Sequence, residues 1–543
     1  MVRKLLFVLL VTINFAYSQN TVGTTDISEG VFDGFTLYTV STETYLINNC
    51  GEVINQWTSN FPPGNAVYLL ENGNILRAGK TSSTDISFGG QGGVVEIFDW
   101  DGNLAWQYFY DTPMMRQHHD VFPMPNGNVL ILAATRMTNT EAIQAGRDPS
   151  LLSQTDLYNE QIIEVTPVGI NSATIIWEWN VKDHLVQDFD NTKDNFGDVS
   201  LSPEKLNINF LNGGNGGSNW LHFNSIQFNV VLNQIVISSR NLSEIYIIDH
   251  STTTAEAATN SGGLYGKGGE FLYRWGNPQS YNQGSETDRK LYGQHYPHVI
   301  APDLVDQNKI ILFNNGNGRI PEFSEVLVLN PTTDSPGVYS YVSNTAYGPT
   351  TPDYIYEDTA TPTDFFSHIL SSSQRLPNGN TLICEGINGR FFEITASEDI
   401  VWEYINPVST ANGSVASQGE DPSSYPNSTF RGIKYGTDYA AFIGKDVTPG
   451  NPIELNPDVT ECNNLSLSDY EKSTISLYPN PTKDKIRINS ISNIDKVEVY
   501  NVLGSKVDET NTKIIDLSKQ TNGIYFLKIY SHSRITTKKV IKN

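Results

Sequence analysis

Two short sequence motifs, called the first and the second phrase below, recur along most of this chain and constrain its fold more than any other feature. One is a polar turn built on Asn or Gly followed by an apolar strand, at 71–76, 125–130, 233–236, 307–312, 377–382 and, in a degraded copy, 436–442. The other is an apolar strand, a turn and a strand carrying Trp or Tyr, beginning at 44–47, 94–98, 162–165, 244–248, 326–329 and 391–394. Short hairpin strands repeating every ~50–75 residues are typical of a β-propeller. Six copies of each phrase predict six four-stranded blades, with seven blades as the alternative count.

The order of the phrases predicts how the ring closes. The chain enters on the second phrase and leaves on the first, so we expect strands from both ends of the domain to share the last blade. Aromatic residues make up 11% of the chain and charged residues 17%, and there are 43 glycines. This composition favours turn-rich, all-β structure over helix.

Composition shifts divide the chain into four parts. Residues 1–18 have a basic start, an apolar core and a small-residue end, which is typical of a cleaved signal peptide. The predicted propeller spans 19–447, a linker rich in Pro, Asn and acidic residues spans 448–472, and a small β-sandwich spans 473–543. We therefore expect an exported protein with no transmembrane segment.

Charge and cysteine content narrow the partners. The net charge of −24 disfavours nucleic acid and anionic membranes as partners. Cys50, Cys384 and Cys462 lack the close spacing of a metal site. One disulfide with one thiol left over is expected, with the pairing open.

Histidines gather just before the first strands of the predicted hairpins. His118 and His119 precede the second hairpin, and His222 precedes the third. His295 and His298 precede the fourth hairpin, and His368 precedes the fifth. In a propeller these positions line one end of the central channel. We therefore expect most of the nine histidines to face one cavity.

One hairpin adds other polar groups to this ring. His222 and Asn224 are two residues apart, so on a strand they face the same side. Arg240 ends the returning strand and should lie beside them. Together they offer hydrogen-bond donors for one small anion.

Two chemistries suit such a ring: metal binding and group transfer to a His nucleophile. Arg240 disfavours a metal because it would repel a dication, and it favours a transferred oxyanion such as a sulfuryl or phosphoryl group. A nucleotide-type phosphate loop is absent, since the glycines of 212–218 lie in an irregular insertion.

Three segments resemble the bacterial arylsulfate sulfotransferase family: 220–250, 266–278, and Gly293-Gln294-His295 with Phe313-Asn314-Asn315-Gly316. The resemblance implies a six-bladed propeller that moves a sulfuryl group from a phenolic sulfate to a phenol through a sulfohistidine. It implies no nucleotide donor, no cofactor and no metal. The alternative is a secreted, non-catalytic propeller that binds a sulfated or phenolic ligand or a surface partner.

The resemblance also implies residue roles. His295 would be the nucleophile, with His298 as its rival, and His222, Asn224 and Arg240 would hold the sulfuryl oxygens. His119 would assist catalysis, and the expected substrate-binding residues are His118, His298, His368 and Asn315. Asn314-Asn315-Gly316 departs from the Asp-Asn-Gly that family members often carry, and a pair of nearby cysteines found in some members is missing.

The C-terminal segment resembles the sorting domain of the Bacteroidetes type IX secretion system. Tyr478-Pro479-Asn480-Pro481, the Asn501-Val502-Leu503-Gly504 turn and the strand from Gly523 carry the likeness. It implies passage across the outer membrane by the type IX machinery, removal of this domain, and a secreted or cell-surface product.

Overall fold

The structure is a computed structural model that describes residues 20–152, 156–213, 217–460, 462, 476–489, 494–502, 504–531 and 534–543. The expected signal peptide at 1–18 and most of 461–475 lie outside these ranges, as does Leu503. The chain folds into two compact units, Met1–Pro457 and Asp458–Asn543. No helix among the described residues is long and apolar enough to span a membrane.

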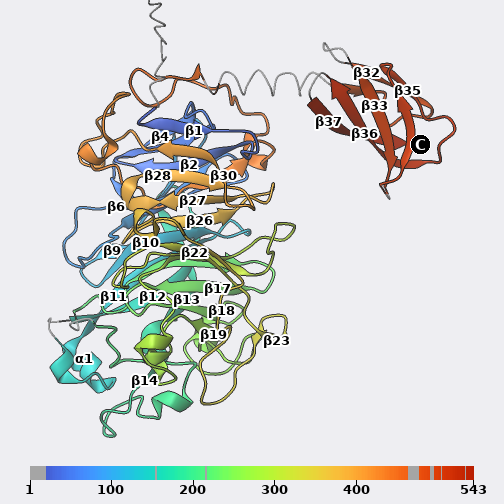
Figure 1. Cartoon of the computed structure of the whole chain (residues 1–543). Coiled ribbons are helices and arrows are strands. Elements are labelled where there is room, and N and C mark those ends of the chain that lie inside the picture. The colour runs from blue at the N-terminus through green and yellow to red at the C-terminus, as the bar shows by residue number, and fades with distance from the viewer. Residues whose placement is uncertain are drawn as a thin grey trace, which may run out of the picture. The chain divides into compact units, whose positions relative to one another are not determined.

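In its described part the first unit contains six antiparallel sheets of four or five strands (Figure 1). The first sheet holds β30 (Ile433–Gly436), β2 (Gly34–Val40), β3 (Glu43–Ile47) and β4 (Val53–Thr58). The second holds β5 (Pro63–Leu69), β6 (Ile75–Lys80), β7 (Gly93–Phe98) and β8 (Leu104–Phe109). The third holds β9 (Asp111–Thr112), β10 (Met115–Pro123), β11 (Val129–Thr138), β12 (Asp156–Val168) and β13 (Ser172–Asn180). The other three are β16 (Phe223–Asn229), β17 (Gln234–Ser239), β18 (Glu244–Asp249) and β19 (Tyr273–Trp275); β20 (His295–Val299), β21 (Ile310–Asn314), β22 (Glu325–Leu329) and β25 (Tyr354–Tyr356); and β26 (Ser372–Arg375), β27 (Thr381–Glu385), β28 (Arg390–Ile394), β29 (Ile400–Ile405) and β1 (Gly23–Ile27). The expected all-β class is confirmed.

Smaller elements lie in the connections between these strands. Two short ladders are β14 (Leu185–Val186) with β15 (Leu206–Asn207), and β23 (Thr333–Ser335) with β24 (Val338–Tyr339). The two α-helices of the described residues are α1 (Asn139–Gln144) and α2 (Thr254–Ala257). Both helices begin at a Thr capping box.

The Asn-Gly-Asn copies of the first phrase form the same turn. The side chains of Asn72, Asn126 and Asn378 each accept a hydrogen bond from the backbone N–H two residues later. The intervening glycines have φ between +85° and +92°, a conformation that glycine adopts at no steric cost. The turn therefore follows from local chemistry and sets up each returning strand.

The Trp residues of the second phrase fasten neighbouring sheets together. Each buries its ring and donates its indole N–H to a partner in the turn or the loop region of another strand pair. These bonds are Trp57 to Asp99 O, Trp106 to Ser172 O, Trp177 to Thr252 Oγ1, Trp275 to Pro349 O and Trp402 to Asn49 O.

The first strands of the six sheets lie against one another in a closed circuit. β2 contacts β5, β5 contacts β10, and the contacts continue from β10 to β16, from β16 to β20 and from β20 to β26. Gln374 on β26 then exchanges hydrogen bonds with the backbone of Lys434 on β30, which pairs with β2. Strands from both ends of the unit meet in two sheets, β30 with β2 and β1 with β29, where the sequence predicted one such sheet. The second closure arises because residues 23–27 add a fifth strand to the last sheet.

The second unit is a β-sandwich over its own apolar core. One sheet holds β31 (Ser476–Tyr478), β32 (Lys485–Asn489) and β35 (Ile514–Asp516); the other holds β34 (Lys506–Thr510), β33 (Lys496–Asn501), β36 (Gly523–Ser531) and β37 (Arg534–Lys542). Ile486, Val497, Val499, Leu527 and Ile529 lie in the core between them.

The cysteines are in two states. Cys50 and Cys462 are disulfide-bonded, whereas Cys384 is a buried free thiol on β27.

Candidate active site

Irregular backbone in three neighbouring strands positions the histidines. The pairing register shifts within β10, β16 and β20, as it does at a β-bulge. His119, His222 and Tyr296 have φ values of +50°, +50° and +53° beside these shifts. Such bulges bend a strand and re-aim its side chains, and non-glycine residues rarely adopt this conformation. The irregularity therefore turns side chains out of the regular alternation at one end of each strand.

His295 is held in a single tautomer. Its Nδ1 lies 2.7 Å from Asn315 Oδ1 and 3.1 Å from the carbonyl oxygen of Gly293, both acceptors. The Asn315 amide nitrogen donates to the carbonyls of Ser367 and Leu370, which fixes the orientation of its oxygen. Nδ1 therefore carries the proton, and Nε2 keeps its lone pair. Burial, reinforced by the nearby Arg240 charge, lowers the pKa of His295 to about 3, so the ring is neutral.

Arg240 and His222 supply donors beside this ring. The Arg240 backbone N–H donates to the carbonyl oxygen of His222, which joins the two ends of the hairpin as the sequence predicted. Its guanidinium has no carboxylate partner among the described residues and bonds only to the Asn241 side chain. Asn219 donates to Nδ1 of His222 at 2.5 Å, so the remaining N–H of that ring is on Nε2. A cation and an N–H donor are therefore free for an anion.

His118 and His119 form a chain of hydrogen bonds with a buried carboxylate. The two Nδ1 atoms lie 2.9 Å apart, and His118 Nε2 lies 2.9 Å from Glu160 Oε2 on β12. The rings of His119 and His222 are 4.7 Å apart between centroids. Burial, followed by the charges of His222, His118, His295 and Arg240, lowers the pKa of His119 well below its ordinary value. Glu160 was not anticipated from the sequence.

Two phenylalanines line the cluster formed by His118, His119, His222 and His295. The Phe88 ring lies 4.9 Å from that of His118 and 6.0 Å from that of His222. The centroid of the Phe430 ring lies 6.3 Å from the ring centroids of both His119 and His295, so the Phe430 ring is a neighbour of both histidines. An apolar aromatic wall beside an anion-binding group suits an aryl ester of an oxyacid.

Arg116 holds the loop that carries Phe88. Its buried guanidinium donates to backbone carbonyls of Thr81, Ser83, Ile86 and Gly92. Gly90 in this loop has a φ of +83°, and a Cβ there would collide with the His119 ring. The loop can therefore approach His119 only with glycine at this position.

Asn224 and Asn315 both bond to groups beside or on His295. Asn224 lies at the bulge of β16 and donates to the carbonyl oxygen of Gln294, so it holds the segment leading to His295. Asn315 is fully buried and orients His295 from behind. The roles expected of these two residues toward a substrate stay predictions.

Other histidines lie apart from the cluster. Nδ1 of His298 donates to the carbonyl oxygen of Tyr296, and the ring packs on that of Tyr296; burial lowers the pKa of His298 to about 4. His368 is exposed, and its one ring contact is with Phe366. His184 is buried against Trp179 and His250 pairs with Glu164, while His532 lies outside the described residues. The contacts thus group His118, His119, His222 and His295, four of the eight described histidines.

A family model described as Arylsulfotransferase (ASST) matches residues 28–412, well over half of the chain. The chain belongs to the arylsulfotransferase family. A second model, for a secretion system C-terminal sorting domain, matches residues 476–543 of this arylsulfotransferase-family protein. The sorting domain is of the type IX system and supports export to a secreted or cell-surface location.

Solved structures resemble this arylsulfotransferase-family chain only distantly. A protein of unknown function from Bacteroides caccae is 10% identical, covering 74% of this chain and 98% of its own, with a TM-score of 0.39. A periplasmic gluconolactonase from Pseudomonas aeruginosa is 8% identical, covering 94% and 99%, with a TM-score of 0.34. These scores are too low to support an argument about function. A search of curated proteins finds no match.

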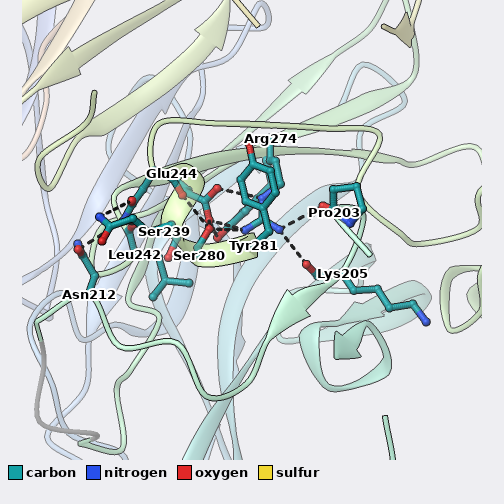
Figure 2. A network of polar contacts seen from close by, with 12 residues as sticks. Pro203, Lys205, Asn212, Ser239, Leu242, Glu244, Arg274, Ser280 and Tyr281 are labelled. Carbon is teal, nitrogen blue, oxygen red and sulfur yellow. Dashed lines mark hydrogen bonds and ion pairs between the residues drawn. The ribbon is translucent and has the colours of Figure 1, made fainter. Parts of the chain in front are cut away.

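A buried polar network is centred on Glu244 and Arg274 (Figure 2). Arg274 donates to both oxygens of Glu244 and to the backbone carbonyls of Pro203 and Lys205. Ser280 donates to the same carboxylate at 2.6 Å. The backbone carbonyl of Glu244 accepts from the Gln294 side chain, next to His295. The Tyr-Arg-Trp-Gly-Asn-Pro segment of this arylsulfotransferase-family chain thus supports the strand that presents His295.

Proposed function

We propose that the protein is an arylsulfate sulfotransferase that moves a sulfuryl group from a phenolic sulfate to a phenol through a sulfohistidine at His295. The observation that carries the proposal is the fixed tautomer of His295, with a neutral ring and Nε2 free. A neutral imidazole nitrogen is a competent nucleophile. Membership of the arylsulfotransferase family supports the same reaction class.

In the first half-reaction His295 Nε2 attacks the sulfur of the aryl sulfate. The N–S bond forms as the S–O bond to the aryl group breaks, and the aryloxide leaves with the electron pair. The imidazole ring becomes cationic, and its Nδ1–H strengthens the hydrogen bond to Asn315. In the second half-reaction a phenol oxygen attacks the same sulfur as its proton passes to a base of the site, and the electron pair of the N–S bond returns to His295. That proton goes on to the aryloxide that leaves in the next cycle.

Arg240 and the Nε2–H of His222 are the groups we assign to the sulfuryl oxygens. Preorganised donors stabilise charge on a transferring group without reorganising during the reaction. The lack of a carboxylate partner for this guanidinium among the described residues supports this role, because an internal carboxylate would compete with the anion. We place Phe88 and Phe430 beside the aryl groups of donor and acceptor.

We further propose that the six sheets are the blades of one propeller, with residues 19–447 as the catalytic domain, 448–472 as the linker and 473–543 as the sorting domain. The circuit of first strands and the Trp bonds between sheets support this architecture. The matched sorting domain supports delivery through the type IX machinery, with residues 1–18 as the export signal.

The direct test uses the purified full chain with p-nitrophenyl sulfate, following nitrophenolate release with and without phenol. Phenol-dependent release should fall by at least ~10³-fold in His295→Ala, since the nucleophile itself is removed. His368→Ala is the matched control, because that ring is exposed and outside the cluster. Release that survives in His295→Ala but is lost in His298→Ala would transfer the role to His298. No release from folded protein with several aryl sulfates would instead favour a non-catalytic binding propeller.

A further inference from the structure

Glu160, His118 and His119 form one hydrogen-bonded chain that ends at the candidate active site. Glu160 Oε1 accepts the backbone N–H of Phe223, and Oε2 faces His118 Nε2, both at 2.9 Å. The carboxylate is almost fully buried and has no Lys or Arg partner in the part of the chain that the structure describes. Its partners are therefore a backbone amide and one imidazole.

The order of donors along this chain follows from the carboxylate. A lone pair on His118 Nε2 would face the negative oxygen, so that nitrogen carries the proton and donates. In a neutral His118 ring, Nδ1 is then an acceptor. The facing Nδ1 of His119, 2.9 Å away, must donate. The proton of neutral His119 is thus on Nδ1, and its lone pair is on Nε2.

Nε2 of His119 lies against the backbone of Gly90 and has no hydrogen-bond partner among the residues described. The ring packs near His222 and Phe430, and Phe430 also contacts His295. His119 and His295 therefore share the Phe430 ring, against which we expect the acceptor phenol to pack.

We propose that Glu160 and His118 are positioning residues that hold His119 as the base for the acceptor phenol; this inference rests on the proposed function. The phenol O–H bond breaks as its proton moves to His119 Nε2, and the phenol oxygen bonds to the sulfur on His295. The His119 imidazolium then donates through Nδ1 to His118, whose Nε2–H faces the Glu160 charge. In the next cycle His119 returns this proton to the leaving aryloxide, so protons balance over one turnover.

Glu160→Gln tests the relay because it reverses the donor order. The Phe223 N–H still needs an acceptor, so the new amide oxygen faces Phe223 and the amide nitrogen faces His118. His118 must then accept at Nε2 and donate from Nδ1, which moves the proton of His119 to Nε2. The lone pair that accepts the phenol proton is lost.

The kinetic readout separates the two half-reactions. With p-nitrophenyl sulfate, the burst of nitrophenolate reports formation of sulfohistidine, and phenol-dependent turnover reports the acceptor step. We expect Glu160→Gln to slow the acceptor step about 100-fold, a general-base effect, and to slow the burst far less. The control is Glu164→Gln, another His-paired glutamate on β12, which should leave the ratio of the two rates as in the wild type. Equal slowing of both steps in Glu160→Gln would overturn the proposal.

A second readout does not require the variant to fold. In ¹⁵N-histidine spectra of the wild-type protein, Nε2 of His119 should have the chemical shift of a nitrogen without a proton, and Nε2 of His118 that of an N–H. A proton on His119 Nε2 in the wild type would contradict the relay. Absence of phenol-dependent nitrophenolate release from the wild type would instead refute sulfuryl transfer itself, so the two failures are distinguishable.

Discussion

Arg431 forms a buried ion pair with Asp120, at 3.0 Å, although the two residues are 311 positions apart. Asp120 follows His119 on β10, and Arg431 follows Phe430 just before β30. The same carboxylate accepts the backbone N–H of Ile226 on β16. One charged pair therefore joins three of the strands that surround the cluster.

Asp120→Asn should destabilise the protein by about 3–5 kcal/mol, because it leaves a buried guanidinium without its counter-charge. Urea denaturation of the full chain measures this difference. Asp303→Asn, at an exposed turn, is the control and should change stability by less than ~0.5 kcal/mol. Similar effects in both variants would show that the ion pair is not needed for folding.

Asn315→Leu should lower kcat while the protein stays folded, because His295 would lose the acceptor that fixes its tautomer. We expect a fall of about 10²-fold or more, since a misassigned tautomer disables a catalytic histidine even when the ring remains in place. Steady-state kinetics with an aryl sulfate and phenol, alongside a thermal melt, separate this effect from unfolding. An unchanged kcat would rule out the role of Asn315.

The acid limit of activity should lie near pH 3–4 rather than 6.5. His295 loses its lone pair only below its pKa of about 3, which burial and Arg240 depress. The profile of kcat/KM should therefore stay flat from about pH 5 to 8 with respect to this group. In Arg240→Gln the depressing charge is gone, so the acid limit should move to higher pH even though the rate is lower.

Stability should fall as the pH drops below about 6.5. The unfolded chain takes up protons on its histidines there, whereas burial lowers the pKa of His119 and His222 well below that value in the folded state. Proton uptake thus favours the unfolded chain. Denaturation midpoints at pH 5 and pH 8 measure the difference, and a midpoint that does not fall at pH 5 would contradict it.

Arg116→Lys should raise KM for the aryl sulfate, because an ammonium group cannot reach the carbonyls that hold the Phe88 loop. A rise of about tenfold corresponds to a loss of about 1.4 kcal/mol in binding. If Arg116 acts through Phe88, then Phe88→Leu and the double variant should show non-additive effects. Additive effects would separate the two residues.

Cys384 should resist alkylation in the native protein and react in denaturant without reductant. It is buried on β27, and burial raises the pKa of its thiol to about 12, so little reactive thiolate forms. Mass spectrometry after iodoacetamide treatment should find one modified cysteine per unfolded chain. Two or three modified cysteines without reductant would contradict the disulfide state of Cys50 and Cys462.

Local patterns predicted the sheets well and the site only in part. The Asn-Gly-Asn turns and the Trp strands depend on chemistry within a few residues, so Asn72 and Trp57 could be read directly from the sequence. The partners that complete the site come from distant strands. Glu160 belongs to the polar segment Asn159-Glu160-Gln161, which precedes the apolar residues of a predicted strand. That polar segment is the sequence feature that could have indicated a functional role for Glu160. Nothing near Phe88 or Phe430 in the sequence indicates which rings they face.

The left-handed backbone at His119, His222 and Tyr296 has a consequence for how this protein would respond to selection. A side chain in that conformation costs roughly 1–3 kcal/mol, and glycine would remove much of that cost. Glycine would also remove a packed ring at each position, and deleting a packed side chain costs about 2–5 kcal/mol, at least as much as the strain that is relieved. Selection for heat resistance should therefore retain these side chains, so that stability and the placement of the rings favour the same residues.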